Sequence, residues 1–293
     1  MNEWTDGYWW SKDGLRLHYR DYPGDAACPP ILCIPGLTRN ARDFEGLASR
    51  LAGRNRVIVV DLRGRGESAY AKDPLTYVPL TYVQDLQALF VELAMPRYIA
   101  IGTSLGGILS LLIAATDRQR LAGLVLNDIG PAIEASGLER IRAHVGKNQT
   151  WPTWLHAARA LEDANRDIHA GWGLQDWLAH AKRLCRLSPQ GRIIFDYDMK
   201  IAEPFNLPGG EAGVDLWPTL DALAGIPTLL VRGGRSDILS AQTAARMVGR
   251  VPGMDLVTLP DAGHAPLLTE PEAFAAIDRL VERANGEAAR GDA

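Results

Sequence analysis

A serine set between glycines stands where an apolar run ends and a helical pattern begins. The run YIAIG at 98–102 leads into GTSLG at 102–106, and apolar residues then recur at helical spacing over 105–116. At a sharp strand-to-helix turn the serine must hold a strained backbone, and small residues two positions away on each side let neighbouring backbone approach. The helix N-terminus behind the serine favours developing negative charge. Ser104 is therefore predicted to be a nucleophile.

A serine hydroxyl attacks well only when a base takes its proton. His264 lies in the loop DAGHAP at 261–266, just after the last expected strand, and parallel strands end at one common rim. We therefore expect His264 to be the general base. For the other five histidines a surface or core role is the default: His18, His144, His156, His169 and His180.

The histidine in turn needs an acid that holds its tautomer. Asp237 follows the expected strand 227–233, and the order Ser104, Asp237, His264 is a known triad order. Asp128, at the end of the strand 121–127, is a rival on the same rim. We assign the triad role to Asp237 and expect Asp128 to accept hydrogen bonds from loop amides.

An oxyanion formed by serine attack needs two preorganised N–H donors. One is expected from the amide of Leu105, which directly follows the nucleophile. The other is expected from Leu37, because Pro35-Gly36 permits a turn that points this amide inward.

The composition excludes several classes of protein. The chain has 293 residues, a formal net charge of −4 and no block of like charge, so nucleic-acid and anionic-membrane binding are poor predictions. Three cysteines without metal-ligand spacing favour a reducing compartment. No leader-like or membrane-spanning apolar stretch stands out. We expect a cytoplasmic protein that binds a small molecule.

Short apolar runs alternate with helical patterns, which predicts an α/β protein with a mostly parallel sheet. An antiparallel hairpin over 8–22, turning at Asp13-Gly14, is expected to open the chain. The expected strands are 31–34, 56–60, 98–102, 121–127, 227–233 and 254–259, and the expected helices are 41–52, 80–94, 105–116, 241–249 and 271–284. The tail from Asn285 is expected to fray.

The alternation stops over 131–216, where the pattern is mostly helical with no convincing strand. Ser136 and Glu139 form a capping-box pattern that predicts a helix start near 137. We therefore expect a core made of residues 1–130 and 217–293, and a helical cap over 131–216. Half of the eight tryptophans fall in this cap: Trp151, Trp154, Trp172 and Trp177. They either contact an apolar or aromatic substrate or join the cap to the core.

With these residues in place, the chain resembles the α/β-hydrolase superfamily, and in particular its lidded, esterase-like members. The resemblance rests on PG at 35–36, DLRGRGES at 61–68, GTSLGG at 102–107, the loop around Asp237 and AGHAP at 262–266. It implies an eight-stranded, mostly parallel sheet with helices on both faces, a helical cap, and no metal or organic cofactor. Many members have His-Gly where this chain has Pro35-Gly36.

The resemblance implies hydrolysis of a small or medium carboxylic ester through an acyl-enzyme on Ser104. Hydrolysis of a carbon–carbon bond or an enol lactone by the same triad is an alternative, although such enzymes often have Trp where Ala265 stands. A ligand receptor on the same fold, with slow turnover, is a third possibility. The pattern leaves the oligomeric state open.

Overall fold

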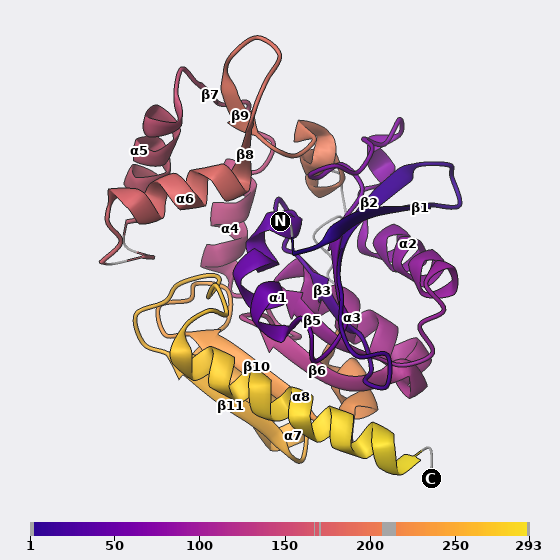
Figure 1. Ribbon diagram of the computed structural model, residues 1–293. Coiled ribbons are helices and arrows are strands. Elements are labelled where there is room, and N and C mark those ends of the chain that lie inside the picture. The colour runs from indigo at the N-terminus through magenta and orange to yellow at the C-terminus, as the bar shows by residue number, and fades with distance from the viewer. Residues whose placement is uncertain (1–2, 167, 170, 207–214, 292–293) are drawn as a thin grey trace.

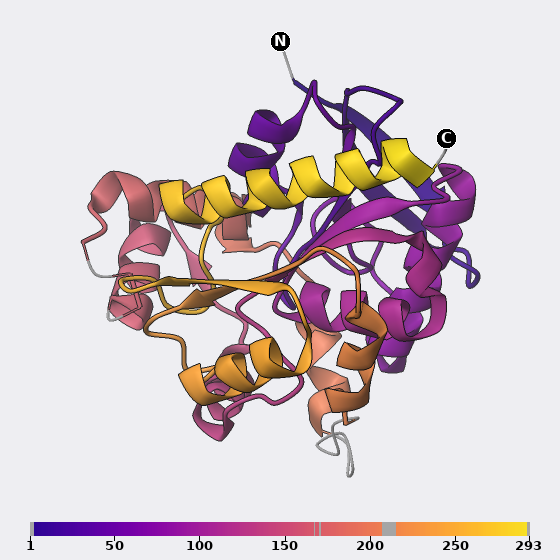
Figure 2. The same ribbon diagram turned by 90° about the horizontal axis from the view of Figure 1, so that it is seen from below.

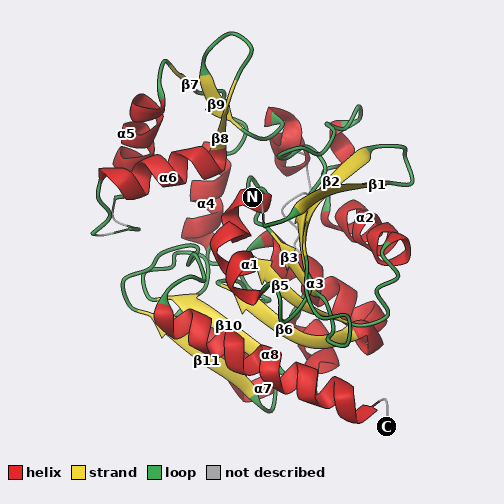
Figure 3. Ribbon diagram, in the orientation of Figure 1, coloured by secondary structure: helices red, strands yellow, loops and turns green. Residues whose placement is uncertain are grey.

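One large sheet forms the centre of the protein (Figures 1 and 3). The computed structural model describes residues 3–166, 168–169, 171–206 and 215–291. The sheet has eight strands in the order β1-β2-β4-β3-β5-β6-β10-β11. Their bounds are β1 Thr5–Trp10, β2 Arg16–Tyr22, β3 Ile31–Ile34, β4 Val57–Asp61, β5 Tyr98–Thr103, β6 Leu121–Asn127, β10 Thr228–Gly233 and β11 Met254–Leu259.

The predicted mostly parallel sheet is confirmed. Neighbouring strands from β4 through β11 in this order pair in parallel, and β2 pairs antiparallel with both β1 and β4. The predicted opening hairpin is also present, and its loop spans residues 11–15 with Gly14 at φ +77°. All residues of β3, β4, β6 and β10 are buried, as expected for strands that are covered on both faces.

Helices cover both faces of the sheet because alternate strand residues point in opposite directions. Leu32 and Ile34 belong to a core cluster that includes residues of α2 and α3, whereas Ile31 and Cys33 belong to a second cluster with α1 and α8. Figure 2 shows α8 running across one face and α7 lying on the opposite side. The helices of this region are η1 Ala41–Phe44, α1 Glu45–Leu51, η2 Pro74–Thr76, α2 Pro79–Glu92, α3 Leu105–Asp117, η3 Arg118–Arg120, η5 Trp217–Leu223, α7 Ala241–Arg250 and α8 Pro271–Gly291.

The segment 131–216, hereafter the insertion, contains both helices and strands. Its described elements are α4 Ala135–His144, β7 Thr150–Trp151, α5 Trp154–Asn165, α6 Leu174–Leu184, β8 Cys185–Leu187, β9 Ile193–Phe195 and η4 Met199–Asn206. The three strands pair antiparallel in the order β7-β9-β8, so the expectation of a strand-free insertion was wrong. These strands have only two or three residues each, too few to show a period in the sequence. Residues 207–214 of the predicted cap lie outside the described residues.

Two predicted helix ends also differ from the structure. The first helix of the insertion begins at Ala135, after Glu134, and Ser136 lies inside it rather than capping it. The last helix does not fray at Asn285 but continues to Gly291. Helix boundaries depend on cap geometry, which a residue pattern alone does not determine.

No helix in the described part of the chain is both long and apolar enough to cross a bilayer. The cytoplasmic location stays a prediction.

The close approach of α3 to β3 yields a testable difference between two helical glycines. A Cβ atom on Gly106 would overlap the backbone carbonyl of Ile34, whereas one on Gly249 would meet nothing within 4 Å. We expect Gly106→Ala to lower the free energy of unfolding by about 1–3 kcal/mol, through overpacking. Gly249→Ala should raise it by up to about 1 kcal/mol, because alanine is the better helix former. Urea unfolding monitored by circular dichroism measures both, and equal effects of the two substitutions would contradict the packing described here.

Candidate active site

Ser104 occupies the sharp turn between β5 and α3. Its backbone has φ +53° and ψ −116°, a region that costs a non-glycine residue of the order of 1–3 kcal/mol. The turn is held by the Ser104 amide, which donates to the carbonyl of Asn127 at 3.0 Å. Cβ atoms on Gly102 or Gly106 would overlap neighbouring backbone, so both positions require glycine. The strained turn expected from GTSLG is therefore present.

His264 lies beside this serine. Its Nε2 is 2.9 Å from the Oγ of Ser104, and its side chain is 11% exposed. The loop that carries it is fixed to β6, because the side-chain amide of Asn127 donates to the carbonyl of Pro266 at 2.9 Å. The structure thus brings together the two residues that the sequence predicted to meet.

Asp128 is the carboxylate that contacts the histidine. Its Oδ2 is 2.8 Å from the Nδ1 of His264, and its Oδ1 accepts from the amide of Gly233 at 2.8 Å. Asp128 is fully buried and has φ +55°. Because a carboxylate only accepts, Nδ1 of His264 donates and Nε2 is free to accept from the serine hydroxyl. This is the tautomer that a general base beside a serine needs.

Asp237 does not contact His264, and our assignment of the histidine's partner to Asp237 was wrong. Its carboxylate instead pairs with Arg140 of α4, at 2.5 Å to Nε and 2.8 Å to Nη2. The hydrogen bonds from Arg140 hold the pKa of Asp237 below its usual value, against the opposing effect of burial. Asp128 was expected to accept from loop amides, whereas it accepts from the amide of Gly233 at the end of β10 and contacts the ring of His264.

Strand order gives the physical reason. Thr103 at the end of β5 pairs with Asn127 at the end of β6, so Ser104 and Asp128 are the next residues of adjacent strands. Asp237 follows β10, which lies one strand farther from β5. Both acids end strands at the same rim, so a residue pattern could not separate them. Arg140 in the insertion is the cation that pairs with Asp237, but the sequence alone does not show that these two residues meet.

The two predicted oxyanion donors belong to turns that adjoin Ser104. Leu105 is the first residue of α3, and the first amides of a helix have no partner within it. A Cβ on Gly36 would lie 3.6 Å from the Cβ of Ser104, so the turn before Leu37 touches the serine. Arg65 donates to the carbonyl of Leu37 at 2.8 Å and holds this loop in place. Leu37 lines the same cavity as Ser104, and both donor roles stay predictions.

A cavity of about 420 Å³ opens over these residues. The core lines it through Leu37, Ser104, His264 and the loops around them, and the insertion supplies much of the remaining wall. The lining residues from the insertion include Arg140, Ile141, Trp151, Leu161, His169, His180, Phe195 and Tyr197. The cavity is therefore shared between the sheet rim and the insertion, with both apolar and polar walls.

Of the four tryptophans in the insertion, Trp151 is the one that appears among the described lining residues of this cavity. Trp177 is buried in a small core of the insertion, and Trp151, Trp154 and Trp172 pack against that core. Most of these tryptophans therefore form or support the small hydrophobic core of the insertion. Among the residues that the structure describes, Trp151 is the one of these four tryptophans placed to contact a molecule in the cavity.

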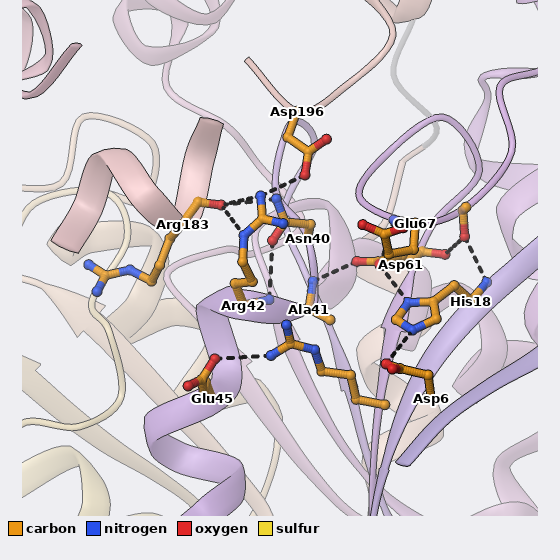
Figure 4. Close-up of polar contacts among 12 residues, drawn as sticks. Asp6, His18, Asn40, Ala41, Arg42, Glu45, Asp61, Glu67, Arg183 and Asp196 are labelled. Atoms are coloured by element: carbon orange, nitrogen blue, oxygen red, sulfur yellow. Dashed lines mark hydrogen bonds and ion pairs between the residues drawn. The ribbon is translucent and has the colours of Figure 1, made fainter. Parts of the chain in front are cut away.

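A polar clamp joins the insertion to the core beside the site (Figure 4). The carbonyl of Arg183 accepts from Asn40 at 3.0 Å and from Nε of Arg42 at 3.1 Å, and Arg42 also pairs with Asp196 at 2.6 Å. Asp61 holds the same loop from the core side through the amide of Ala41. The clamp fixes the insertion close to the loop that carries Leu37.

No group of three or more histidine, cysteine or acidic side chains in the described part of the chain is arranged to hold a metal ion. The expectation that no cofactor is needed stays a prediction.

Comparison with known proteins shows the family and the fold of this chain. A sequence profile of the alpha/beta hydrolase family matches residues 31–277. The chain belongs to this family. A crystal structure of an α/β hydrolase from Novosphingobium aromaticivorans is 58% identical, with a TM-score of 0.93 over 97% of this chain and 99% of that one. The fold is thus the α/β-hydrolase fold.

Two curated members of the family are similar over most of their length. The 3-hydroxybutyrate-oligomer hydrolase of Cupriavidus necator is 35% identical over 275 residues, which is 89% of this chain and 90% of that protein. An esterase of Mycobacterium tuberculosis is 28% identical, over 87% of this chain and 83% of that protein. These similarities support hydrolase activity for this member of the α/β hydrolase family.

The Asp237–Arg140 pair yields a prediction of pH dependence. Because the pKa of Asp237 is lowered from 3.8 in the folded protein, its stabilising effect is complete above that value and is lost as the pH falls through the folded pKa. Asp237→Asn should therefore lower the free energy of unfolding by about 1 kcal/mol or less at pH 7, since the pair is partly exposed. Urea unfolding of both proteins at a series of pH values measures this difference. It should be constant from pH 7 to 5 and shrink below pH 4, and growth toward acid would contradict the pairing.

Proposed function

We propose that this α/β hydrolase cleaves carboxylic esters through an acyl-enzyme on Ser104. The observation that carries the proposal is the chain of two hydrogen bonds from Ser104 through His264 to Asp128, at 2.9 and 2.8 Å. In the first step Ser104 attacks the ester carbonyl while His264 takes its proton, and Asp128 stabilises the imidazolium. The amides of Leu37 and Leu105 hold the oxyanion. The protonated His264 then gives this proton to the departing alcohol as the ester C–O bond breaks and the acyl-enzyme forms. In the second step His264 takes a proton from water, which attacks the acyl-enzyme, and passes it to Oγ of Ser104 as the acid leaves.

The proposed substrate is a small or medium ester, and oligoesters of short hydroxy acids are the first class to examine. The cavity of about 420 Å³ supports a substrate of limited size. The similarity to a 3-hydroxybutyrate-oligomer hydrolase supports the oligoester class. We further propose that the insertion acts as a cap, because it supplies much of the cavity wall over Ser104.

The first prediction concerns the nucleophile. Wild-type protein should turn over p-nitrophenyl esters, and Ser104→Ala should lose several orders of magnitude in kcat because no acyl-enzyme can form. Turnover across a series of acyl lengths should decline once the chain no longer fits the cavity. Circular dichroism of the variant controls for folding. Equal rates for the two proteins would contradict the proposal, and a burst followed by negligible turnover would favour the ligand-receptor alternative.

The second prediction separates the two acids. Asp128→Asn should lower kcat by about 10⁴, because an amide at this position no longer selects the histidine tautomer that the base needs. Asp237→Asn is the matched control and should change kcat little, since its partner is Arg140 rather than His264. Steady-state kinetics with one p-nitrophenyl ester measures both variants. A large loss in Asp237→Asn with none in Asp128→Asn would restore the acid assigned from the sequence.

A further inference from the structure

His180 on α6 is a buried polar side chain in the wall of the cavity that contains Ser104. The residue is 6% exposed, and its ring packs against Trp172 and Trp177 with centroids 5.2 and 5.9 Å away. Its Nδ1 lies 3.4 Å from Nη2 of Arg183. The structure gives Nε2 no hydrogen-bond partner among the residues it describes. Nε2 is not one of the fully enclosed, unpartnered polar atoms of the described residues, so it is accessible to a molecule that occupies the cavity.

The hydrogen on this ring can be assigned. Burial holds the pKa of His180 well below its usual range, and the cations Arg39 and Arg183 lower it further, so the ring is neutral near pH 7. A guanidinium only donates, so Nδ1 must accept from Arg183. The single ring hydrogen is therefore on Nε2. His180 thus presents the Nε2–H group to the cavity as a hydrogen-bond donor and not as an acceptor.

Two cations and one acid lie around this ring: the carboxylate of Asp43 pairs with Arg39 and is 4.0 Å from Nε of Arg183. Arg39 and Arg183 are the charged residues that lower the pKa of His180, and they also add to the burial that lowers the pKa of the neighbouring His169 to about 4. Figure 4 shows the side chain of Arg183 extending away from the clamp with Arg42. Two positive charges and one negative charge leave a net charge of +1, which beside a neutral donor favours a negatively charged oxygen over a neutral one.

Arg39 places one of these positive charges close to Ser104. It lines the cavity, and its Nε and Nη2 bind Asp43 at 2.5 and 2.7 Å, which leaves Nη1 outside that pair. A Cβ on Gly36 would lie 3.3 Å from Cγ of Arg39 and 3.6 Å from Cβ of Ser104, so both side chains lie next to Gly36. An anion held between Arg39 and His180 would therefore lie in the cavity close to the ester under attack.

We propose that His180 Nε2 and the guanidinium of Arg39 form a subsite for a carboxylate carried by the ester substrate. The inference rests on the proposed ester hydrolysis and adds a specificity to it: the preferred substrate has a free acid end. For an oligoester of hydroxy acids this end is the terminal carboxylate. His180 acts here as a specificity-determining residue and takes no part in the bond-breaking step.

The test compares two substrates that differ only at the acid end. They are the linear dimer of 3-hydroxybutyrate and the same dimer with a terminal carboxamide, and p-nitrophenyl butyrate reports basal esterase activity. Wild type should prefer the acid dimer. His180→Phe keeps an aromatic ring against the tryptophans but has no donor, and it should lower kcat/KM for the acid dimer by about 10- to 100-fold, as expected for a hydrogen bond to a charged group. Its rates on the other two substrates should stay near wild type.

Two further variants separate recognition from folding. His180→Gln retains an N–H donor and should recover part of the preference for the acid dimer. His156→Phe is the matched control, because His156 is an exposed histidine on α5 whose Nδ1 contacts Thr153, and it should change no rate. Equal losses on all three substrates in His180→Phe would assign His180 a structural role only and overturn the inference.

The failure of the inference can be distinguished from the failure of the proposed function. Wild type that hydrolyses p-nitrophenyl butyrate in a Ser104-dependent way, yet shows no preference for the acid dimer, would overturn the carboxylate subsite and leave the esterase intact. Wild type without Ser104-dependent hydrolysis of any of the three esters would overturn both.

Discussion

The buried carboxylate of Asp128 links the fold to the site. One oxygen accepts from the amide of Gly233 at the end of β10, and the other meets the ring of His264 in the loop after β11. One side chain therefore joins three neighbouring strands at their carboxyl ends. Its φ of +55° is a strained conformation that the surrounding sheet must maintain. Removing the carboxylate would leave both a buried amide and the histidine without an acceptor.

The positions of the other site residues follow from the same rim. Ser104 is next in register to Asp128, and the serine amide donates to the carbonyl of Asn127. The side chain of Asn127 in turn holds the loop of His264 through Pro266. The site is thus built on the two central strands β5 and β6, which are rigid because helices cover both of their faces. A rigid support keeps the donor and acceptor atoms within hydrogen-bonding distance.

We propose that the insertion contributes selectivity, whereas the hydrogen-bonded chain of Ser104, His264 and Asp128 belongs to the core. Its residue Arg140 neutralises Asp237, the second acid on the rim, and its residue His180 presents a neutral donor to the cavity. The clamp of Arg42 on Asp196 and on the carbonyl of Arg183 holds the insertion against the core. Substrate preference among members with this sheet can therefore change through the insertion, with the rim left as it is.

The sequence by itself determined the α/β class, the parallel sheet, the serine turn and the meeting of Ser104 with His264. These rest on local signals, namely buried apolar runs, glycines around a strained turn, and the rule that parallel strands end at one rim. Only the tertiary structure chose Asp128 over Asp237, because strand order placed β6 beside β5 and brought Arg140 of the insertion onto the rival acid. The small sheet β7-β9-β8 and the place of His180 in the cavity wall also depend on contacts between segments distant in the chain. Such contacts leave no period or motif in the sequence.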